Sequence, residues 1–425
     1  MKNRSRFELQ NARLSHLSLN CRRGLPLLMV ALLVFCGNMT GQAQVSANVS
    51  RITIKSTVLG EERVVLVRTP AGYETNKHSY PVLYMTDGDA HIGHTASTVE
   101  FLARNGRMSE LIVVGIPNTD RGRDLSPVKS SATTPDGKPQ FPTTGGADNF
   151  LKFIETELIP NIEKNYRVRP YRILAGHSLG GLFVIHAMLA RPGVFNSYVA
   201  VSPALQWENQ EILKRAEAFF KNRKELNATL FVSLGNEPGP IGQSFDDFKR
   251  LLAKTQVKDF VWEARQMDDE DHGSVVMPSH YAGLRKVYDG WQMPRDHTGA
   301  ISGGLKAVDE HYQKLSRRFG YEIQSPELLV NLLGYQSLAA GKTDEAIAIF
   351  KANVERYPGS ANVYDSLAEA YEKSDQIELA RPLYEKAQIL GQQNSDPNLA
   401  IYKANFERAS QKVKETQARK ANEEK

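Results

Sequence analysis

One stretch of the chain decides the fold: Arg172-Ile-Leu-Ala-Gly-His-Ser-Leu-Gly-Gly-Leu-Phe-Val-Ile-His-Ala-Met-Leu189. The short apolar run before Ser178 predicts a buried strand, and the apolar residues from Leu182 onward follow the spacing of a helix. A Gly-x-Ser-x-Gly pattern alone is a common turn and indicates little. A serine between a strand and a helix, however, is typical of a nucleophile on a strained elbow. Gly176 and Gly180 fit that interpretation, because side chains at those positions would collide.

Strands and helices alternate from Ser50 to about Pro294. Nearly continuous apolar strands with helices between them indicate an α/β protein whose mostly parallel sheet is covered on both faces. The segment Thr119–Gly146 is rich in glycine, proline, serine and threonine, and we expect a mobile loop at the rim of the active face. The expected strands are 64–67, 81–85, 111–116, 173–175, 198–201, 229–233 and 260–263, and the expected helices are 94–106, 147–164, 179–190, 243–255 and 278–291.

A nucleophilic serine needs a base and an acid that orients the base. His272 follows the last expected strand and precedes the last helix of this region, where the base of such a hydrolase belongs. An imidazole can take and return a proton at neutral pH. Glu237 is the first carboxylate after strand 229–233 and is therefore the predicted acid. The alternatives for the acid are Asp246 and Asp247, expected on the following helix, and Asp269 and Asp271, expected to be solvated.

The anion that forms when a serine attacks an ester needs two N–H donors. The first is the amide of Leu179, at the start of a helix whose dipole also favours negative charge. The second should come from the turn after strand 81–85, and we assign it to the amide of Asp89. His91 and His94 lie nearby but lack a third ligand, so we interpret them as pocket or surface residues. The sequence predicts no metal and no cofactor.

Residues 1–43 have the order of an export signal. A pair of arginines precedes an apolar run from Leu25 to Cys36, and small residues lead up to Ala43. We therefore expect cleavage after Ala43 and a periplasmic or secreted protein without membrane attachment. An uncleaved anchor and a lipoprotein at Cys36 are the alternatives.

The charge and the cysteines are concentrated in the same leader. Residues 1–43 hold six basic residues and one glutamate, so they carry the whole formal charge of +5 and the rest of the chain is neutral. A neutral mature chain implies no basic face for nucleic acid. Both cysteines, Cys21 and Cys36, also lie there, so the mature protein should lack disulfides, thiol catalysis and cysteine-based zinc sites.

After Pro294 the pattern is helical throughout, and it repeats. Gly341–Ala346 recurs as Lys373–Ala380, with Ala346 and Ala380 34 residues apart. This period predicts two tetratricopeptide repeats. Two repeats are too few to stand alone, so we expect them to pack on the first domain, where their free face either limits access to the active-site rim or binds a protein partner. The same offset relates Phe350 to Tyr384, Leu333 to Leu367 and Gly334 to Ala368.

Several segments match a known family when they are taken together. They are Val82–Gly88, Pro117–Pro127, Gly176–Gly181, Ser202–Ala204, and His272 with Tyr281–Leu284. As a set they resemble the esterase D branch of the α/β-hydrolases, which includes siderophore, feruloyl and acetyl-xylan esterases, S-formylglutathione hydrolase and mycolyltransferases. The resemblance covers about residues 50–292.

The resemblance implies an α/β-hydrolase fold with Ser178 as nucleophile and His272 as base. It also implies that the amides of Asp89 and Leu179 form the oxyanion hole, and it leaves the acid, Glu237, least fixed. Two further residues are expected to contact the substrate, namely Trp207 and Arg123.

The sequence thus predicts an exported serine hydrolase that cleaves carboxylic esters through a Ser-His-Glu triad and an acyl-enzyme. Siderophore, acyl and feruloyl esters are the candidate substrates. The alternatives are an adaptor protein whose hydrolase domain is inactive and an acyltransferase on the same fold. The expected domains are a signal peptide (1–43), the hydrolase (44–294), a linker helix (295–322), the repeats (323–410) and a charged tail (411–425).

Overall fold

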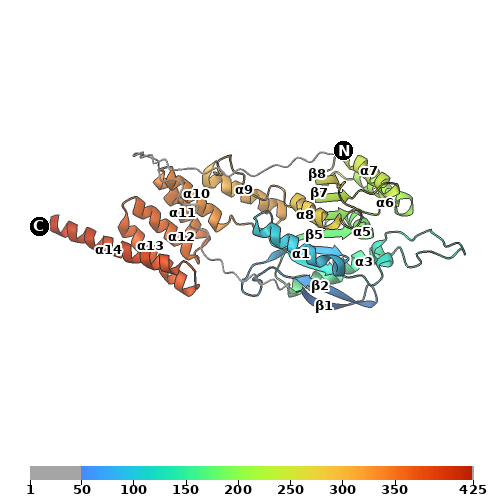
Figure 1. Ribbon diagram of the computed structural model, residues 1–425, viewed down its shortest axis with the longest axis horizontal. Coiled ribbons are helices and arrows are strands. Elements are labelled where there is room, and N and C mark those ends of the chain that lie inside the picture. Colours follow the sequence, from blue (N-terminus) through green and yellow to red (C-terminus); the bar gives the residue numbers. More distant parts are fainter. Residues whose placement is uncertain (1–48, 424–425) are drawn as a thin grey trace, which may run out of the picture. The chain divides into compact units, whose positions relative to one another are not determined.

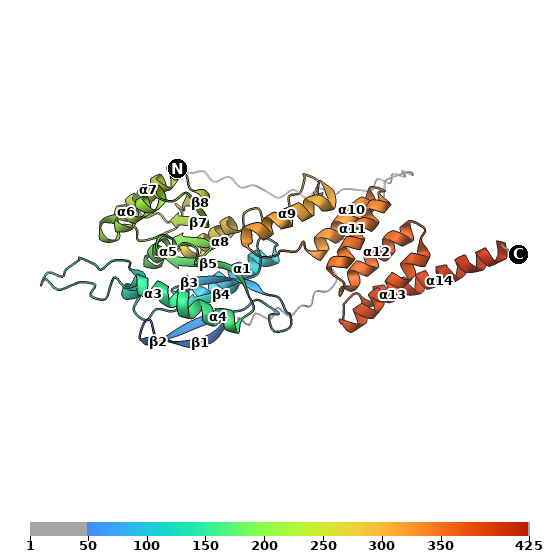
Figure 2. The same ribbon diagram turned by 180° about the vertical axis from the view of Figure 1, so that it is seen from behind.

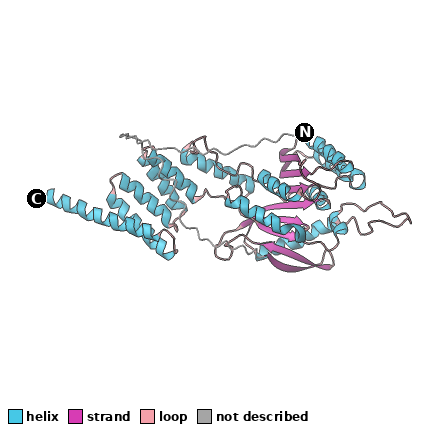
Figure 3. Cartoon of the chain, viewed as in Figure 1, coloured by secondary structure: helices cyan, strands magenta, loops and turns pink. Residues whose placement is uncertain are grey.

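The computed structural model describes residues 49–423, so the predicted export signal and its cysteines lie outside the described residues. The strands are β1 (Val49–Ser56), β2 (Glu61–Arg68), β3 (Tyr80–Thr86), β4 (Ile112–Ile116), β5 (Val168–His177), β6 (Ser197–Val201), β7 (Glu225–Leu234) and β8 (Lys258–Gln266). They form one sheet (Figures 1 and 3). The order of the strands in it is β1-β2-β4-β3-β5-β6-β7-β8. β2 is antiparallel to both of its neighbours, and all other neighbours are parallel.

Helices cover both faces of this sheet, as the sequence predicts for an α/β protein. Along β3 the side chains alternate: Val82 and Tyr84 join one buried cluster, and Leu83 and Met85 join the other. The first cluster includes residues of α3 (Ala147–Phe153), α4 (Ile159–Asn165), α5 (Leu179–Ala190), α6 (Trp207–Lys221) and α7 (Pro240–Ala253). The second includes residues of α1 (Gly88–Arg104) and α8 (Val276–Val287). Figure 2 shows the sheet and its helices from behind. The predicted α/β class, with a mostly parallel sheet covered on both faces, is confirmed.

Among the longer elements, the sequence prediction missed β1 and α6. β1 is mostly exposed at the edge of the sheet, so it lacks the apolar run that marks the inner strands. α6 begins with three residues in the left-handed region, Glu208 to Gln210, which interrupt the helical pattern. The expected rim loop also contains a short helix, α2 (Arg121–Leu125), and an isolated bridge between Thr133 and Pro139.

The chain beyond α8 is helical, as expected. Its helices are α9 (Gly304–Phe319), α10 (Glu327–Ala339), α11 (Thr343–Arg356), α12 (Ala361–Lys373), α13 (Ile377–Gln393) and α14 (Leu399–Glu423). The ring of Phe319, at the end of α9, stacks on Tyr288 at 5.0 Å and lies 4.7 Å from the ring of Tyr171. Within residues 49–423, no helix combines the length and the apolar character needed to cross a membrane.

Residues related by the 34-residue offset are buried in the same way. Ala346 and Ala380 are fully buried on α11 and α13, and so are the aromatic rings of Phe350 and Tyr384. Gly334 of α10 packs directly on Phe350, because a Cβ at that glycine would lie 2.4 Å from the ring. The repeat pattern thus marks the helix–helix contacts, while the assignment to the tetratricopeptide class stays a prediction.

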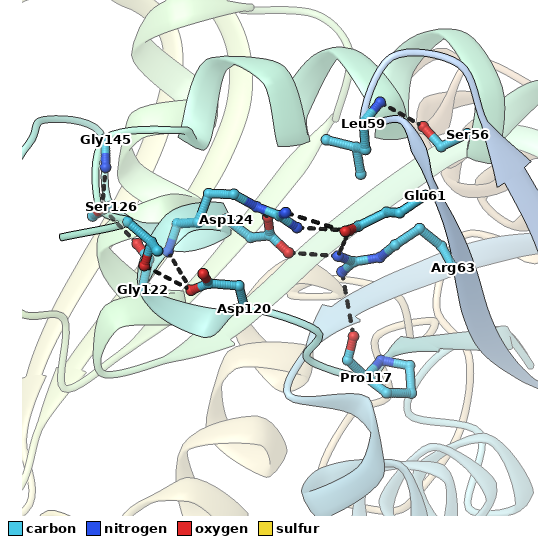
Figure 4. A network of polar contacts seen from close by, with 12 residues as sticks. Ser56, Leu59, Glu61, Arg63, Pro117, Asp120, Gly122, Asp124, Ser126 and Gly145 are labelled. Carbon is cyan, nitrogen blue, oxygen red and sulfur yellow. Dashed lines mark hydrogen bonds and ion pairs between the residues drawn. The ribbon is translucent and has the colours of Figure 1, made fainter. Parts of the chain in front are cut away.

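A buried ionic network joins the rim segment to the sheet (Figure 4). Arg63 of β2 is 1% exposed and its Nη1 lies 2.6 Å from Oδ2 of Asp124, a residue of α2 that is 2% exposed. Arg63 also pairs with Glu61, and Arg123 bridges Glu61 and Asp124 at 2.6 and 2.7 Å. The hydrogen bond from Arg123 lowers the pKa of Glu61. These four side chains fix the start of the segment that follows β4.

We expect Asp124→Asn to lower the free energy of unfolding by about 3 kcal/mol, because Arg63 stays buried with one carboxylate fewer. Urea unfolding at neutral pH measures the loss. The matched control is Glu62→Gln, which removes an ion pair between side chains that are 87% and 61% exposed. That change should stay within about 0.5 kcal/mol. If the two substitutions lower the free energy of unfolding equally, burial does not determine how much this network contributes to stability.

Candidate active site

Ser178 lies between β5 and α5, in a conformation that few residues other than glycine adopt. Its φ is 60° and its ψ is −117°, and such a backbone persists only where the surroundings hold it. Here its amide donates to the carbonyl of Val201 at 2.9 Å, and its carbonyl accepts from the amides of Leu182 and Ala204 at 3.0 Å. The strand, turn and helix therefore stand where the sequence predicts them.

Two glycines allow this turn to pack closely. A Cβ on Gly176 would lie 2.4 Å from the carbonyl oxygen of Gly180. A Cβ on Gly180 would lie 2.2 Å from Oγ1 of Thr86, at the end of β3. The elbow is thus pressed against the β3–α1 turn, and any side chain at either glycine would push the two turns apart.

His272 and Glu237 reach Ser178 from the loops after β8 and β7. Nε2 of His272 lies 3.0 Å from Oγ of Ser178, and its Nδ1 lies 2.5 Å from Oε2 of Glu237. The other carboxylate oxygen of Glu237 accepts from the amide of Gly235 at 3.2 Å. The side chain of Glu237 is 9% exposed and that of His272 is 45% exposed. A buried carboxylate, an imidazole and a hydroxyl in this order can move a proton off the serine.

The nearby aspartates have other partners. Oδ1 of Asp271 accepts from the amides of Gly273 and Ser274, both at 2.8 Å, and these bonds lower the pKa of Asp271. Asp247 contacts Gln210 and Arg250 on α6 and α7. Of the carboxylates weighed from the sequence, the structure thus brings Glu237 to the base.

The two predicted oxyanion donors lie at helix starts. Leu179 is the first residue of α5 and Asp89 is the second residue of α1. Amides in the first turn of a helix have no acceptor within the helix, and the dipole there favours an anion. The contact between Gly180 and Thr86 sets these two helix starts side by side at one edge of the sheet.

A further group, which the sequence analysis did not identify, supports the elbow from the other side. Oδ1 of Asp87 accepts from Nδ2 of Asn118 at 2.6 Å and from Nε of Arg121 at 2.7 Å. Nη2 of Arg121 donates to the carbonyl of His177 at 3.1 Å. Burial opposes the charge on Asp87, but the hydrogen bonds from Arg121 outweigh it and lower the pKa of that carboxyl. Asn118 and Arg121 belong to the matching segment Pro117–Pro127, which was the signal available in the sequence.

The two residues expected to contact substrate have different surroundings. Nε1 of Trp207 donates to the carbonyl of Val128 at 3.1 Å, and its ring lies 6.0 Å from that of Phe141 in the rim segment. Arg123 is engaged in the ionic network with Glu61 and Asp124. The arginine that contacts the elbow strand is Arg121, two residues earlier.

Several histidine rings cluster near the base, and the ring of His177 lies 4.6 Å from that of His272. His91 lies 5.9 Å from His177, and His94 stacks on His280 at 5.6 Å. Burial lowers the pKa of His280 to about 3, so this ring is neutral at neutral pH. Among residues 49–423, no three or more histidine, cysteine, aspartate or glutamate side chains are placed to hold a metal ion.

Comparison with known proteins assigns the chain to a family. The family model described as "Putative esterase" matches residues 56–286. The ferri-bacillibactin esterase BesA of Bacillus subtilis is 34% identical over 169 residues, which are 36% of this chain and 58% of that protein. The siderophore enterobactin esterase of Emericella nidulans is 32% identical over 250 residues, which are 48% of this chain and 80% of that protein.

The solved structures agree with the sequence comparison. The crystal structure of an IroE-like serine hydrolase from Shewanella oneidensis is 27% identical, with a TM-score of 0.58. The match covers 73% of this chain and 99% of the solved one. The chain therefore belongs to this esterase family and is a carboxylic ester hydrolase with the α/β-hydrolase fold.

Proposed function

We propose that this esterase cleaves its substrate through a Ser178–His272–Glu237 triad. The observation that carries the proposal is the unbroken pair of contacts from hydroxyl through imidazole to carboxylate. Oγ of Ser178 attacks the ester carbonyl carbon while its proton passes to Nε2 of His272. When the tetrahedral intermediate collapses, the alkoxy oxygen leaves with the proton from Nε2, and the acyl group stays on Ser178. Water then attacks the acyl-enzyme, with His272 again as base, and the acid is released.

Two charges develop during the reaction, one on the former carbonyl oxygen and one on the imidazolium of His272, and each has a proposed partner. The negative charge on the former carbonyl oxygen is stabilised by the amides of Leu179 and Asp89 at the two helix starts. The carboxylate of Glu237 accepts the hydrogen bond from Nδ1–H, which keeps Nε2 free to act as base and stabilises the imidazolium.

The proposed substrate is a siderophore-type ester or another ester with an aromatic acyl group. One similar protein is named a siderophore enterobactin esterase, and another is named a ferri-bacillibactin esterase. In this chain an aromatic pair, Trp207 and the 44% exposed Phe141, is connected to the nucleophile through main-chain hydrogen bonds. The amide of Trp207 bonds to Ala204, whose own amide bonds to Ser178. Aromatic faces offer a stacking surface for an aromatic acyl group.

A substrate screen tests the proposal. The purified protein is given trilactone siderophores, a feruloyl ester and nitrophenyl esters of increasing acyl length, and kcat/KM is measured for each. We expect the aromatic acyl esters and the trilactones to rank first. Turnover of short aliphatic esters alone would contradict the substrate class, and transfer to an added alcohol faster than hydrolysis would identify an acyltransferase.

We expect Trp207→Ala and Phe141→Ala each to raise KM for an aromatic acyl ester by about tenfold, because each removes one ring of the stacking surface. KM for an acetyl ester should stay unchanged, since that acyl group is too small to reach both rings. Phe101→Ala is the matched control, since Phe101 is 50% exposed on α1. An equal rise in KM for the acetyl and the aromatic ester would contradict a stacking role.

The leader and the helical region belong to the same proposal. Residues 1–43 act as an export signal and deliver the hydrolase of residues 44–294 to the periplasm or the outside. The linker helix of 295–322 then leads into tetratricopeptide-like repeats over 323–410, which end in the charged tail of 411–425. Support for the repeats comes from the buried residues at the 34-residue offset. Their proposed role is to stabilise the hydrolase domain and to limit access to its active-site rim, with a surface for a protein partner as the alternative.

A further inference from the structure

The proposed base lies on an exposed loop between β8 and α8. The side chain of His272 is 45% exposed. Asp271 holds the loop internally, because its carboxylate accepts from two amides of its own turn. From outside, the amide of Asn236 donates to the carbonyl of Glu270 at 2.6 Å, two residues before the base. A base on such a loop needs a contact that holds the main chain of the base itself, because small displacements of the reacting groups lower the reaction rate.

His177 supplies a contact at that position. Its Nε2 lies 2.7 Å from the main-chain carbonyl oxygen of His272. A carbonyl can only accept, so Nε2 of His177 carries the hydrogen and donates. Burial, with His272 nearby, lowers the pKa of His177 to about 4, so the ring is neutral at neutral pH. A neutral ring adds no positive charge beside the imidazolium that forms on His272.

The same residue is fixed to the nucleophile. His177 ends β5 and immediately precedes Ser178. Its carbonyl accepts from Nη2 of Arg121, which is paired with Asp87. The rings of His177 and His272 lie 4.6 Å apart, tilted by 46°. His177 therefore joins the strand that carries the serine to the loop that carries the base.

We propose that His177 is a positioning residue, whose Nε2–H holds the main chain of His272 so that the imidazole stays within reach of Ser178. This inference rests on the proposed triad and adds a residue to it. His177 acts through His272 and takes no proton from the substrate.

Three substitutions of His177 test the role of its donor. His177→Gln keeps an N–H donor at the place of Nε2, His177→Asn brings the donor too close to the backbone, and His177→Met removes it. We expect kcat to fall about tenfold in the Met and Asn variants, with KM unchanged, and to stay within about twofold of the original in the Gln variant. The rate of Ser178 labelling by a fluorophosphonate should follow kcat. The matched control is His311→Gln on α9, since Nε2 of His311 also lies 3.1 Å from a main-chain carbonyl oxygen, that of Trp291, and its loss should leave kcat unchanged.

The readouts separate positioning from stability. The Tm of each variant is measured alongside kcat. If His177 had only a structural role, both the Gln and the Met variant would have a lower Tm, and kcat would be low in the Gln variant as well. Equal kcat in the Gln and Met variants would overturn the inference. So would a loss that appears only in KM. If Ser178→Ala still hydrolyses esters, the triad itself fails. If Ser178→Ala is inactive while all His177 variants keep full kcat, only the role of His177 fails.

Discussion

Ser178→Ala should leave a folded protein with almost no esterase activity, its kcat/KM about four to six orders of magnitude lower. The reason is that the acyl-enzyme cannot form without Oγ, so the amides of Leu179 and Asp89 can assist only the slow direct attack of water on the ester. The residual rate comes from binding and orientation of the ester for attack by water.

Covalent labelling makes this prediction independent of the substrate. A fluorophosphonate should add to the intact protein once, and intact mass should show no adduct on Ser178→Ala. Ser97→Ala, on an exposed position of α1, should be labelled like the original protein. An adduct on the Ser178→Ala protein would assign the nucleophile to another residue.

Local patterns were enough to predict the centre of this site. The elbow is encoded within a few residues, because an apolar run, two glycines and a helical pattern surround one serine. The positions of His272 and Glu237 follow from their place after successive strands, because parallel strands end at the same edge of the sheet. For the same reason the α/β class could be predicted before any contact was known.

The direction in which a side chain points, and therefore its partner, could not be predicted in the same way. Arg121 and Arg123 are two residues apart in one matching segment, yet one contacts the elbow strand and the other pairs with Glu61. The difference depends on how the short helix α2 packs against β2. A sequence without contacts carries no such information. The histidine cluster has a similar origin, because its rings come from α1, α8 and the end of β5.

In the helical region the sequence shows a repeat, and the structure shows what the repeated residues do. The 34-residue offset pairs small and aromatic residues, and in the structure these positions are the buried contacts between helices. By contrast, α6 was missed because its first residues leave the right-handed region. The spacing of residues in the sequence therefore predicts regular helix packing. It does not predict a local irregularity of the backbone.

Glu237→Gln should lower kcat by about three to four orders of magnitude while the fold and KM are kept. In the structure Oε2 of Glu237 accepts from Nδ1 of His272 at 2.5 Å, so Nδ1 carries the hydrogen and Nε2 is free to take the serine proton. A glutamine can turn its NH₂ group toward Nδ1. The imidazole then carries its hydrogen on Nε2 and presents a donor to Ser178 where a base is needed. The loss of the carboxylate also removes the charge that stabilises the imidazolium.

Asp271→Asn separates this effect from a general loss of charge near the base. Asp271 accepts from two amides of its own turn, and an asparagine oxygen can still accept both bonds. We therefore expect kcat of Asp271→Asn within about threefold of the original, with at most a small loss of stability. Steady-state kinetics on one ester, with the fluorophosphonate labelling rate of each variant, makes the comparison. A nearly active Glu237→Gln beside an inactive Asp271→Asn would move the acid to Asp271, and the short contact between Glu237 and His272 would then have only a structural role.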